Sequence, residues 1–293
     1  MRIGIHLTPT GDVTIPELRA QAADAAARGF RAAWTNQQPG GWDPLGVLAV
    51  MGDGPAELGT AVVPTYPRHP VALATEALTT QAVTGGRLTL GIGPSHAVYV
   101  EDQLGLPYAS PARHTREYLE VLRPLLRGEH VRYSGAFFTV DTRLAMAVPP
   151  PSVLIAALGP RMLEVARDLA DGTVAVWARP ATVSGYLVPR LAGGARVAAL
   201  VMMSVSADPD RVRATIAREF GHVRDLPAYR ALLDRGGLSG PADTVVAGGE
   251  ARLERELAAF RDAGVTDLIV TPVGTAEERD RAMDVAAGWR GNT

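Results

Sequence analysis

The segment from Leu58 to His96 constrains the fold of this chain more than any other. It begins with a short apolar run that stops at Pro64, and a second apolar run spans Leu88 to Ile92. Between them, apolar residues recur at helical spacing from His69 to Val83, and two glycines then end the helix. Parallel strands joined by a right-handed helical crossover place both carboxyl ends on one edge of a sheet. In such folds ligands bind at that edge, so this segment predicts a fold and a site together.

The same alternation of strand and helix runs along the whole chain. Eight apolar runs read as strands: Arg2–Leu7, Ala32–Thr35, Leu58–Val63, Leu88–Ile92, Val153–Ala157, Thr173–Val176, Ala198–Val205 and Leu268–Thr271. Helical patterns follow them at 15–28, 43–51, 69–83, 111–127, 160–169, 182–191, 209–235 (with breaks), 250–263 and 276–289. Eight such units predict a single (β/α)8 TIM-barrel domain over residues 1–293. Residues 97–151, with a hairpin near 131–139, form an excursion after the fourth strand that we expect to shape the mouth of the site.

Composition excludes several classes of protein. The formal net charge of −2 argues against nucleic acid or an anionic membrane as the partner. No apolar run approaches the roughly 20 residues that span a bilayer, and the opening MRIGIHL reads as a strand and not a signal peptide. We therefore expect a cytoplasmic enzyme that acts on a small molecule. The chain has neither cysteine nor lysine, which excludes thiolate, zinc-thiolate and Schiff-base chemistry.

Polar side chains at the predicted strand ends are amides, hydroxyls and imidazoles, with few carboxylates. They gather at His6, Asn36-Gln37, 62–65, 93–96, 158–161, 177–179, Ser204 and Thr271. No two acidic residues end neighbouring strands, and no histidine pair has metal spacing. A glycosidase dyad or a metal site is therefore not predicted. A cofactorless isomerase or hydrolase is disfavoured for the same reason.

Several of these residues allow two interpretations from local pattern alone. His96 and His6 suit a general acid, but a lone histidine at a strand end is more often a structural hydrogen-bonding group. Gly159-Pro160-Arg161 opens a helix and suits an anion, but it also reads as an ordinary strand-to-helix turn. His69 is interpreted as a residue at the entry to its helix. The tryptophans suit either the core or the wall of an aromatic ring system: Trp34, Trp42 and Trp177.

Four blocks resemble one known family. They are GTAVVPTYPRHPVALATEALTTQAVTGGRLTLGIGPSH, ARHTREYLEVLRPLLRGE, VLIAALGPRMLEVARDLADGTVAVW and RDAGVTDLIVTP. Together they are similar to the luciferase-like monooxygenase superfamily, in its actinobacterial branch of coenzyme F420-dependent oxidoreductases. The likeness covers essentially the whole chain. It implies a bacterial luciferase-like TIM barrel, a homodimer, and a deazaflavin ring held at the barrel mouth.

The resemblance also implies where that ring lies. In the family the third strand carries a bulge behind the ring, often with a non-prolyl cis peptide, and Val62 and Val63 occupy that position here. Asn36 and Gln37, with Trp42 beyond them, would flank the ring. The other cofactor residues expected from neighbouring strand ends are Thr65, Gly93, Ser95, Ala156, Ala157, Leu158, Gly159 and Trp177, with Pro160 and Arg161 at the phosphate.

The resemblance therefore predicts an F420-dependent oxidoreductase. Hydride would pass between deazaflavin C5 and a small organic substrate, in reduction of a C=C or C=N bond more than in alcohol oxidation. His96 is the first candidate proton donor, followed by His6 or a water held by Asn36 and Gln37. The alternatives are a two-component monooxygenase that uses FMN and a non-catalytic flavin-binding protein.

One branch of the family fits this chain poorly. In the sugar-phosphate dehydrogenases, strand two ends with an acidic residue and a histidine, and a glutamate follows strand four. Here the corresponding residues are Asn36, Gln37, and Ser95 or His96. That branch also uses lysine for the substrate phosphate, and this chain has none. Glucose 6-phosphate is therefore not the expected substrate.

Overall fold

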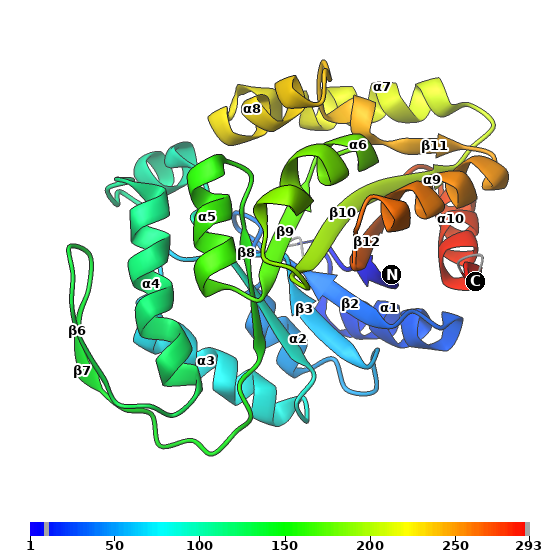
Figure 1. Ribbon diagram of the computed structural model, residues 1–293. Coiled ribbons are helices and arrows are strands. Elements are labelled where there is room, and N and C mark those ends of the chain that lie inside the picture. The colour runs from blue at the N-terminus through cyan, green and yellow to red at the C-terminus, as the bar shows by residue number, and fades with distance from the viewer. Residues whose placement is uncertain (9–11, 291–293) are drawn as a thin grey trace.

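Eight parallel strands close into a barrel in the computed structural model, which describes residues 1–8 and 12–290 (Figure 1). The barrel strands are β1 (Arg2–His6), β2 (Ala32–Thr35), β3 (Glu57–Thr60), β5 (Leu88–Gly93), β8 (Ser152–Ala156), β9 (Gly172–Val176), β10 (Arg196–Val205) and β12 (Asp267–Pro272). Strand β1 pairs with both β2 and β12, and β10 pairs with both β9 and β12, so the ring has no open edge. The predicted (β/α)8 barrel is confirmed.

The outer helices begin where local sequence favours them. Helix α1 (Ile15–Arg28) starts at a capping box made by Thr14 and Glu17 and ends at Gly29, whose φ is 96°. The other helices of this outer layer are α2 (Pro44–Ala49), α3 (Pro70–Val83), α5 (Pro160–Leu169), α9 (Glu250–Asp262) and α10 (Ala276–Gly288). His69 caps α3 and accepts a hydrogen bond from the Val71 amide at 3.3 Å, as expected of a helix-entry residue. None of the described helices is both long and apolar enough to cross a membrane.

Three elements differ from the predicted pattern. The third strand is divided: β3 ends at Thr60, and β4 (Val63–Pro64) pairs with β5 after a bulge. The expected helix at 182–191 is a series of short turns, α6 (Pro180–Thr182), a π-helical turn Val183–Leu187 and a 3-10 turn Val188–Arg190. Gly185 and Pro189 weaken a regular helix there. A three-residue strand, β11 (Val246–Gly248), was not predicted and adds to β10.

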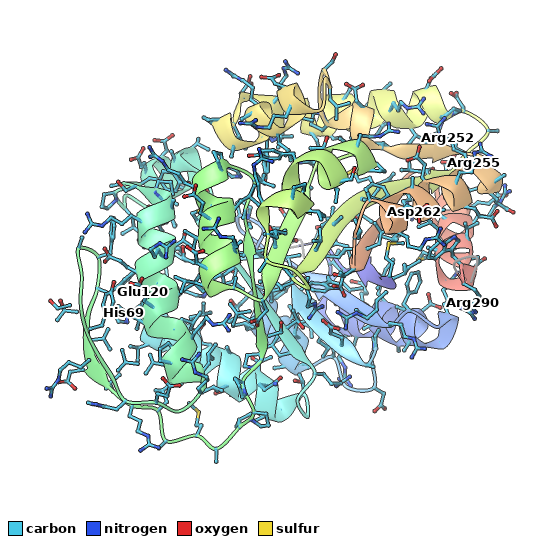
Figure 2. All side chains as sticks on the ribbon, viewed as in Figure 1. His69, Glu120, Arg252, Arg255, Asp262 and Arg290 are labelled. Atoms are coloured by element: carbon cyan, nitrogen blue, oxygen red, sulfur yellow. The ribbon has the colours of Figure 1, made fainter. Side chains whose placement is uncertain are left out.

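The excursion after β5 contains a π-helical turn (Val98–Gln103), helix α4 (Pro111–Leu126) and a hairpin of β6 (Val131–Ser134) and β7 (Thr139–Thr142). The hairpin stands outside α4 in Figure 1. Tyr133 donates to Glu120 Oε2 at 2.7 Å, and the Phe138 ring lies 5.6 Å from His69. Figure 2 labels Glu120 on α4, the helix that the hairpin covers. The hairpin therefore packs on the outside of the barrel, and only the first part of the excursion lies near the strand ends.

The indole ring of Trp34 is the largest group in the interior of the barrel. The indole of Trp34 is buried there, together with Ala32, Leu154, Val174, Ala198 and Ile269. A Cβ added to Gly59 would lie 2.2 Å from this indole, and one added to Gly4 would lie 2.9 Å from it. Two neighbouring strands thus carry glycine because the tryptophan occupies the space of their side chains. The barrel is a packed core with no central pore.

An ionic cluster closes the amino-terminal end of the barrel. The Arg196 guanidinium lies 2.5 Å from Glu57 and 3.0 Å from Asp267, and it donates to the Thr89 hydroxyl at 3.1 Å. Arg2 reaches the same two carboxylates at 2.6 and 2.5 Å. These contacts join β1, β3, β5, β10 and β12.

Helices α7 (Pro209–Phe220) and α8 (Pro227–Arg235) form an outer layer at the top of Figure 1, beyond the end of β10. The Phe220 ring lies 5.7 Å from the ring of Trp177, the residue that follows β9. Val212, Ile216 and Leu233 share a small core with this pair. The two helices are therefore fastened over the carboxyl ends of the strands.

Candidate functional site

Three small residues from adjacent strands form a platform at the barrel mouth. A Cβ on Gly93 would lie 2.9 Å from Val62 Cγ2 and 3.0 Å from Ala156 Cβ, so the three positions are in contact. Val62 and Ala156 are both half-buried. Thr60 ties the bulge to β5: its hydroxyl donates to the Gly91 carbonyl at 2.7 Å and accepts from the Gly91 amide at 2.8 Å. We call Val62, Gly93 and Ala156 the platform.

The two valines of the bulge lie in different environments. Val62 borders the interior cluster around Trp34, whereas Val63 is fully buried in the main core. The peptide bond between Ala61 and Val62 is cis, as the family resemblance implied. Of the two predicted residues, Val62 therefore presents its side chain to the barrel mouth.

Amide side chains and a buried histidine line one side of the platform. Asn36 Oδ1 lies 3.1 Å from His6 Nε2 and accepts from Gln38 Nε2 at 3.3 Å, while Thr8 Oγ1 lies 3.4 Å from His6 Nδ1. These contacts suit a neutral imidazole that is protonated on Nε2. Burial lowers the pKa of His6 to about 4, and the hydrogen bond to Asn36 opposes this only in part.

Gln37 connects the same side to an ionic group outside the barrel mouth. Its backbone amide donates to the Val62 carbonyl at 3.2 Å, and its side-chain oxygen accepts from Arg68 Nη2 at 3.2 Å. Arg68 also contacts Asp43, the residue that caps α2, and lies 3.4 Å from Glu76. The predicted residues Asn36 and Gln37 are thus brought together at the mouth and held in place. We call Asn36, Gln37 and His6 the amide side.

Aromatic rings line a second side of the mouth. The His96 ring lies 4.8 Å from the Tyr229 ring at an interplanar angle of 60°. The Tyr108 hydroxyl donates to the Ser95 carbonyl at 3.0 Å, and Ser95 adopts a left-handed backbone conformation with φ of 62°. Burial lowers the pKa of His96, and it raises the pKa of Tyr108 and Tyr229 to about 12. We call His96, Tyr108 and Tyr229 the aromatic side.

The start of α5 is an open helix amino-terminus. Gly159 is its N-cap and receives no side-chain hydrogen bond, and a Cβ there would meet nothing within 4 Å. Pro160 is the first helical residue, and Arg161 is exposed beside it. An open helix amino-terminus with an adjacent arginine suits an anion. The two residues before it are buried, and the Leu158 carbonyl accepts from the Tyr186 hydroxyl at 3.1 Å.

The remaining predicted cofactor residues lie around these groups. Trp177 is buried against Phe220 beneath α7, and its φ is 59°. Trp42 is 41% exposed, and its indole donates to the Val13 carbonyl at 2.7 Å. Ala157 is buried in the core, where its amide donates to the Thr173 hydroxyl at 3.3 Å. A contact between any of these residues and a cofactor stays a prediction.

Four buried hydroxyl groups at or just after the carboxyl ends of strands have no hydrogen-bond partner among the described residues. They belong to Thr35, Thr65, Ser204 and Thr271. Thr65 lies next to the platform, since its amide donates to the Gly93 carbonyl at 2.9 Å. All four oxygens are inaccessible to solvent, so they are enclosed by protein atoms around the strand ends.

Other features of the molecule do not offer a comparable site. Within residues 1–8 and 12–290, no three histidine, aspartate or glutamate side chains lie close enough to hold a metal ion. A groove of about 740 Å³ lies between α9 and α10, and Arg255 and Arg290 belong to its lining (Figure 2). It lies on the outside of the barrel, and Arg281 in it is paired with Glu250 at 2.8 Å.

Sequence reasoning did not identify Tyr108, Tyr229 or Arg68 as site residues. Tyr108 lies in the excursion, and Tyr229 lies on a helix whose sequence shows only an amphipathic surface. No local pattern indicates that α8 reaches the residues after β5. The position of Arg68 in the sequence does indicate a residue near the site, because Arg68 lies between the third strand and the cap of the following helix.

Comparisons with known proteins agree with this architecture. An uncharacterised protein of Mycobacterium tuberculosis is 29% identical over 259 residues, which cover 77% of this chain and 75% of the relative. The coenzyme F420-dependent tetrahydromethanopterin reductase of Methanopyrus kandleri superposes with a TM-score of 0.81 at 23% identity, over 98% of this chain and 97% of the other. An F420-dependent secondary alcohol dehydrogenase with an F420-acetone adduct superposes with a TM-score of 0.82 at 17% identity and the same coverage. A family model described as luciferase-like monooxygenase matches residues 1–290, and the chain therefore belongs to the luciferase-like monooxygenase family.

Proposed function

We propose that this protein is an F420-dependent oxidoreductase that reduces a C=C or C=N bond of a small organic substrate. The observation that carries the proposal is the platform, where the half-buried apolar side chains of Val62 and Ala156 meet over the buried Gly93 at the carboxyl ends of the strands. The likeness to an F420-dependent reductase and an F420-dependent dehydrogenase supports this choice.

The residues at the mouth fit such a cofactor. Gly93 itself is buried, because Val62 Cγ2 and Ala156 Cβ occupy the space that a side chain there would need, so a ring system would rest on these two half-buried apolar groups. The Thr65 amide donates to the Gly93 carbonyl at 2.9 Å, which fixes the backbone beside the platform. The open amino-terminus of α5, with Arg161 beside it, would hold the phosphate of the cofactor tail.

The amide side would orient the substrate. When bound, the deazaflavin supplies hydride-transfer chemistry. Asn36 Oδ1 is occupied by His6 and Gln38, whereas its side-chain NH2 group has no partner among the described residues. That group is therefore free to donate a hydrogen bond to a carbonyl oxygen or an imine nitrogen. Binding the polar end of the substrate here would place its unsaturated bond over the platform.

The proton that completes the reduction would come from His96. Its pKa is lowered by burial, so the neutral ring prevails at pH 7 and the protonated ring is a stronger acid than ordinary imidazolium. His6 is also neutral at pH 7 and is held by Asn36. We therefore expect the rate of reduction to fall as the pH rises through the pKa of His96. A rate that does not change between pH 5 and pH 8 would contradict this role.

Cofactor binding tests the proposal directly. Apo-protein is titrated separately with F420 and with FMN, and quenching of protein fluorescence reports each dissociation constant. We expect F420 to bind at micromolar concentration or below and FMN to bind more weakly. Micromolar FMN binding without F420 binding would overturn the proposal and favour the two-component monooxygenase. Retention of F420 without oxidation of its reduced form by any enone or imine would favour a non-catalytic flavin-binding protein.

A matched pair of variants tests whether the platform is the binding surface. Gly93→Val adds a Cβ and two methyl groups where Val62 Cγ2 and Ala156 Cβ would already lie only 2.9 and 3.0 Å from the new Cβ. Gly193→Val changes an exposed glycine around which a Cβ meets nothing within 4 Å. We expect the first variant to lose F420 affinity by at least about tenfold and the second to keep it. By family resemblance we also propose a homodimer, which light scattering of the purified protein would test.

A further inference from the structure

The aromatic side of the mouth is assembled from distant parts of the chain. His96 follows β5, Tyr108 lies in the excursion, and Tyr229 lies on α8. Across the strand ends the His96 and Tyr229 rings are in contact, with 4.8 Å between their centroids. The row continues outward, because the Tyr66 ring lies 4.9 Å from Tyr108 and is stacked at 3.9 Å on the His114 ring.

Among the described residues, the charged groups of α8 and of the excursion contact other parts of the chain. On α8, the side chain of Arg230 donates to the Arg224 carbonyl, and Arg235 lies over the Tyr186 ring at 4.5 Å. From the excursion, the Glu101 carboxylate accepts from the Tyr108 amide at 3.2 Å and adds negative charge. The lowered pKa of His96 and the raised pKa of the two tyrosines leave all three rings neutral at pH 7.

We propose that the His96–Tyr229 pair is the wall against which the substrate packs, that it selects a planar, uncharged substrate, and that Tyr229 is the specificity-determining residue. Flat conjugated molecules stack on such rings, whereas an anion would lose its hydration there without gaining a cationic partner. The inference rests on the proposed function only in placing the reacting bond between this wall and the platform. It adds the class of substrate to that function.

Binding of three matched probes tests the wall. Cinnamamide is planar and neutral, cinnamate has the same skeleton with a negative charge, and 3-phenylpropanamide is neutral but lacks the conjugated plane. Dissociation constants are measured by calorimetry at pH 7, with F420 and without it. We expect cinnamamide to bind at least about tenfold more tightly than cinnamate and several-fold more tightly than 3-phenylpropanamide. Equal affinity for the amide and the acid would overturn the proposal, and this comparison needs no variant.

Two substitutions at one position then assign the effect to Tyr229. Tyr229→Phe keeps the ring and should keep the order of the three affinities, whereas Tyr229→Ala should weaken cinnamamide about tenfold and leave cinnamate nearly unchanged. Histidine NMR signals provide a readout that needs no ligand. In Tyr229→Ala the pKa of His96 should rise toward that of an exposed imidazole, and in Tyr229→Phe it should stay low. An alanine variant with unchanged cinnamamide binding and an unchanged His96 titration would refute the role of Tyr229.

The outcomes for the wall and for the cofactor are separable. Failure of F420 to bind, with the preference for cinnamamide intact, would overturn the proposed function and leave the wall. Binding of F420 without any preference among the probes would overturn the wall and leave the proposed function.

Discussion

Replacing Asn36 by aspartate should convert His6 from a neutral to a protonated side chain near neutral pH. In the protein as it stands, burial lowers the pKa of His6 to about 4. The Asn36 oxygen lies 3.1 Å from His6 Nε2, so an aspartate would bring a full negative charge to nearly the same place. At an effective dielectric constant of about 20, two unit charges at that distance attract by about 5 kcal/mol, or about 4 pKa units. The cost of burying the new carboxylate offsets part of this attraction, so we expect the pKa of His6 to rise by about 2 to 4 units.

The measurement is a histidine NMR titration between pH 3 and pH 9. His6→Gln identifies the His6 signal, and Asn36→Ser serves as the matched control because it removes the amide without adding a charge. In Asn36→Ser the pKa of His6 should remain well below its ordinary value. If His6 already titrates near 6.5 in the unchanged protein, burial is refuted as the cause of its low pKa. If the pKa stays near 4 in Asn36→Asp, the electrostatic argument is refuted.

Three further outcomes follow from contacts described above. Arg196→Met should lower the free energy of unfolding in urea by about 3 kcal/mol, because it removes the two hydrogen bonds, at 3.0 and 3.2 Å, that Arg196 donates to an Asp267 side chain that is 3% exposed. Arg2→Met, at a side chain that is 46% exposed, should cost less than about 1 kcal/mol, and equal losses would contradict the argument. Gly59→Ala would place a methyl group 2.2 Å from the buried indole, so it should destabilise by about 2 to 3 kcal/mol and alter the near-ultraviolet circular dichroism; an unchanged spectrum would contradict this. Burial lowers the pKa of His114 to about 4, so between pH 4 and pH 6.5 the unfolded chain binds a proton that the folded chain does not. The stabilisation that comes from this neutral histidine is therefore fully present above pH 6.5 and is lost as the pH falls toward 4. That histidine contributes at most about 1.4 kcal/mol per pH unit in this window, and His114→Phe should flatten the pH dependence of stability accordingly.

The barrel could be predicted because its signals are local. Each barrel strand is a short buried run, and helices α1, α2, α3, α7 and α10 begin at a side-chain cap, so the alternation is visible without any tertiary contact. The division of the third strand was not visible in the apolar run itself. Only the family resemblance indicated a bulge at Val62, since the residues around it have the same composition as an ordinary strand.

The candidate site was predictable as far as it depends on strand order. Asn36 directly follows β2, and Gly93 and Ala156 end the adjacent strands β5 and β8, so parallel pairing around the barrel brings all three to the same edge. Tyr229 was not predictable, because its approach to His96 depends on how two roof helices pack on the end of the barrel. Trp177 illustrates the same limit. Its place after β9 suggested a ring contact, and the packing of Phe220 buries it beneath α7.

The buried Trp34 also determines the order in which molecules can enter. With that indole across the middle of the barrel and the Arg196 cluster at its base, no ligand can pass through the barrel, and the platform is reached from the carboxyl ends of the strands. A molecule seated on Val62 must arrive before anything that lies above it, and it must leave last. Steady-state kinetics of the working enzyme should therefore show a compulsory sequence of binding, with the inner ligand exchanging only when the outer position is empty.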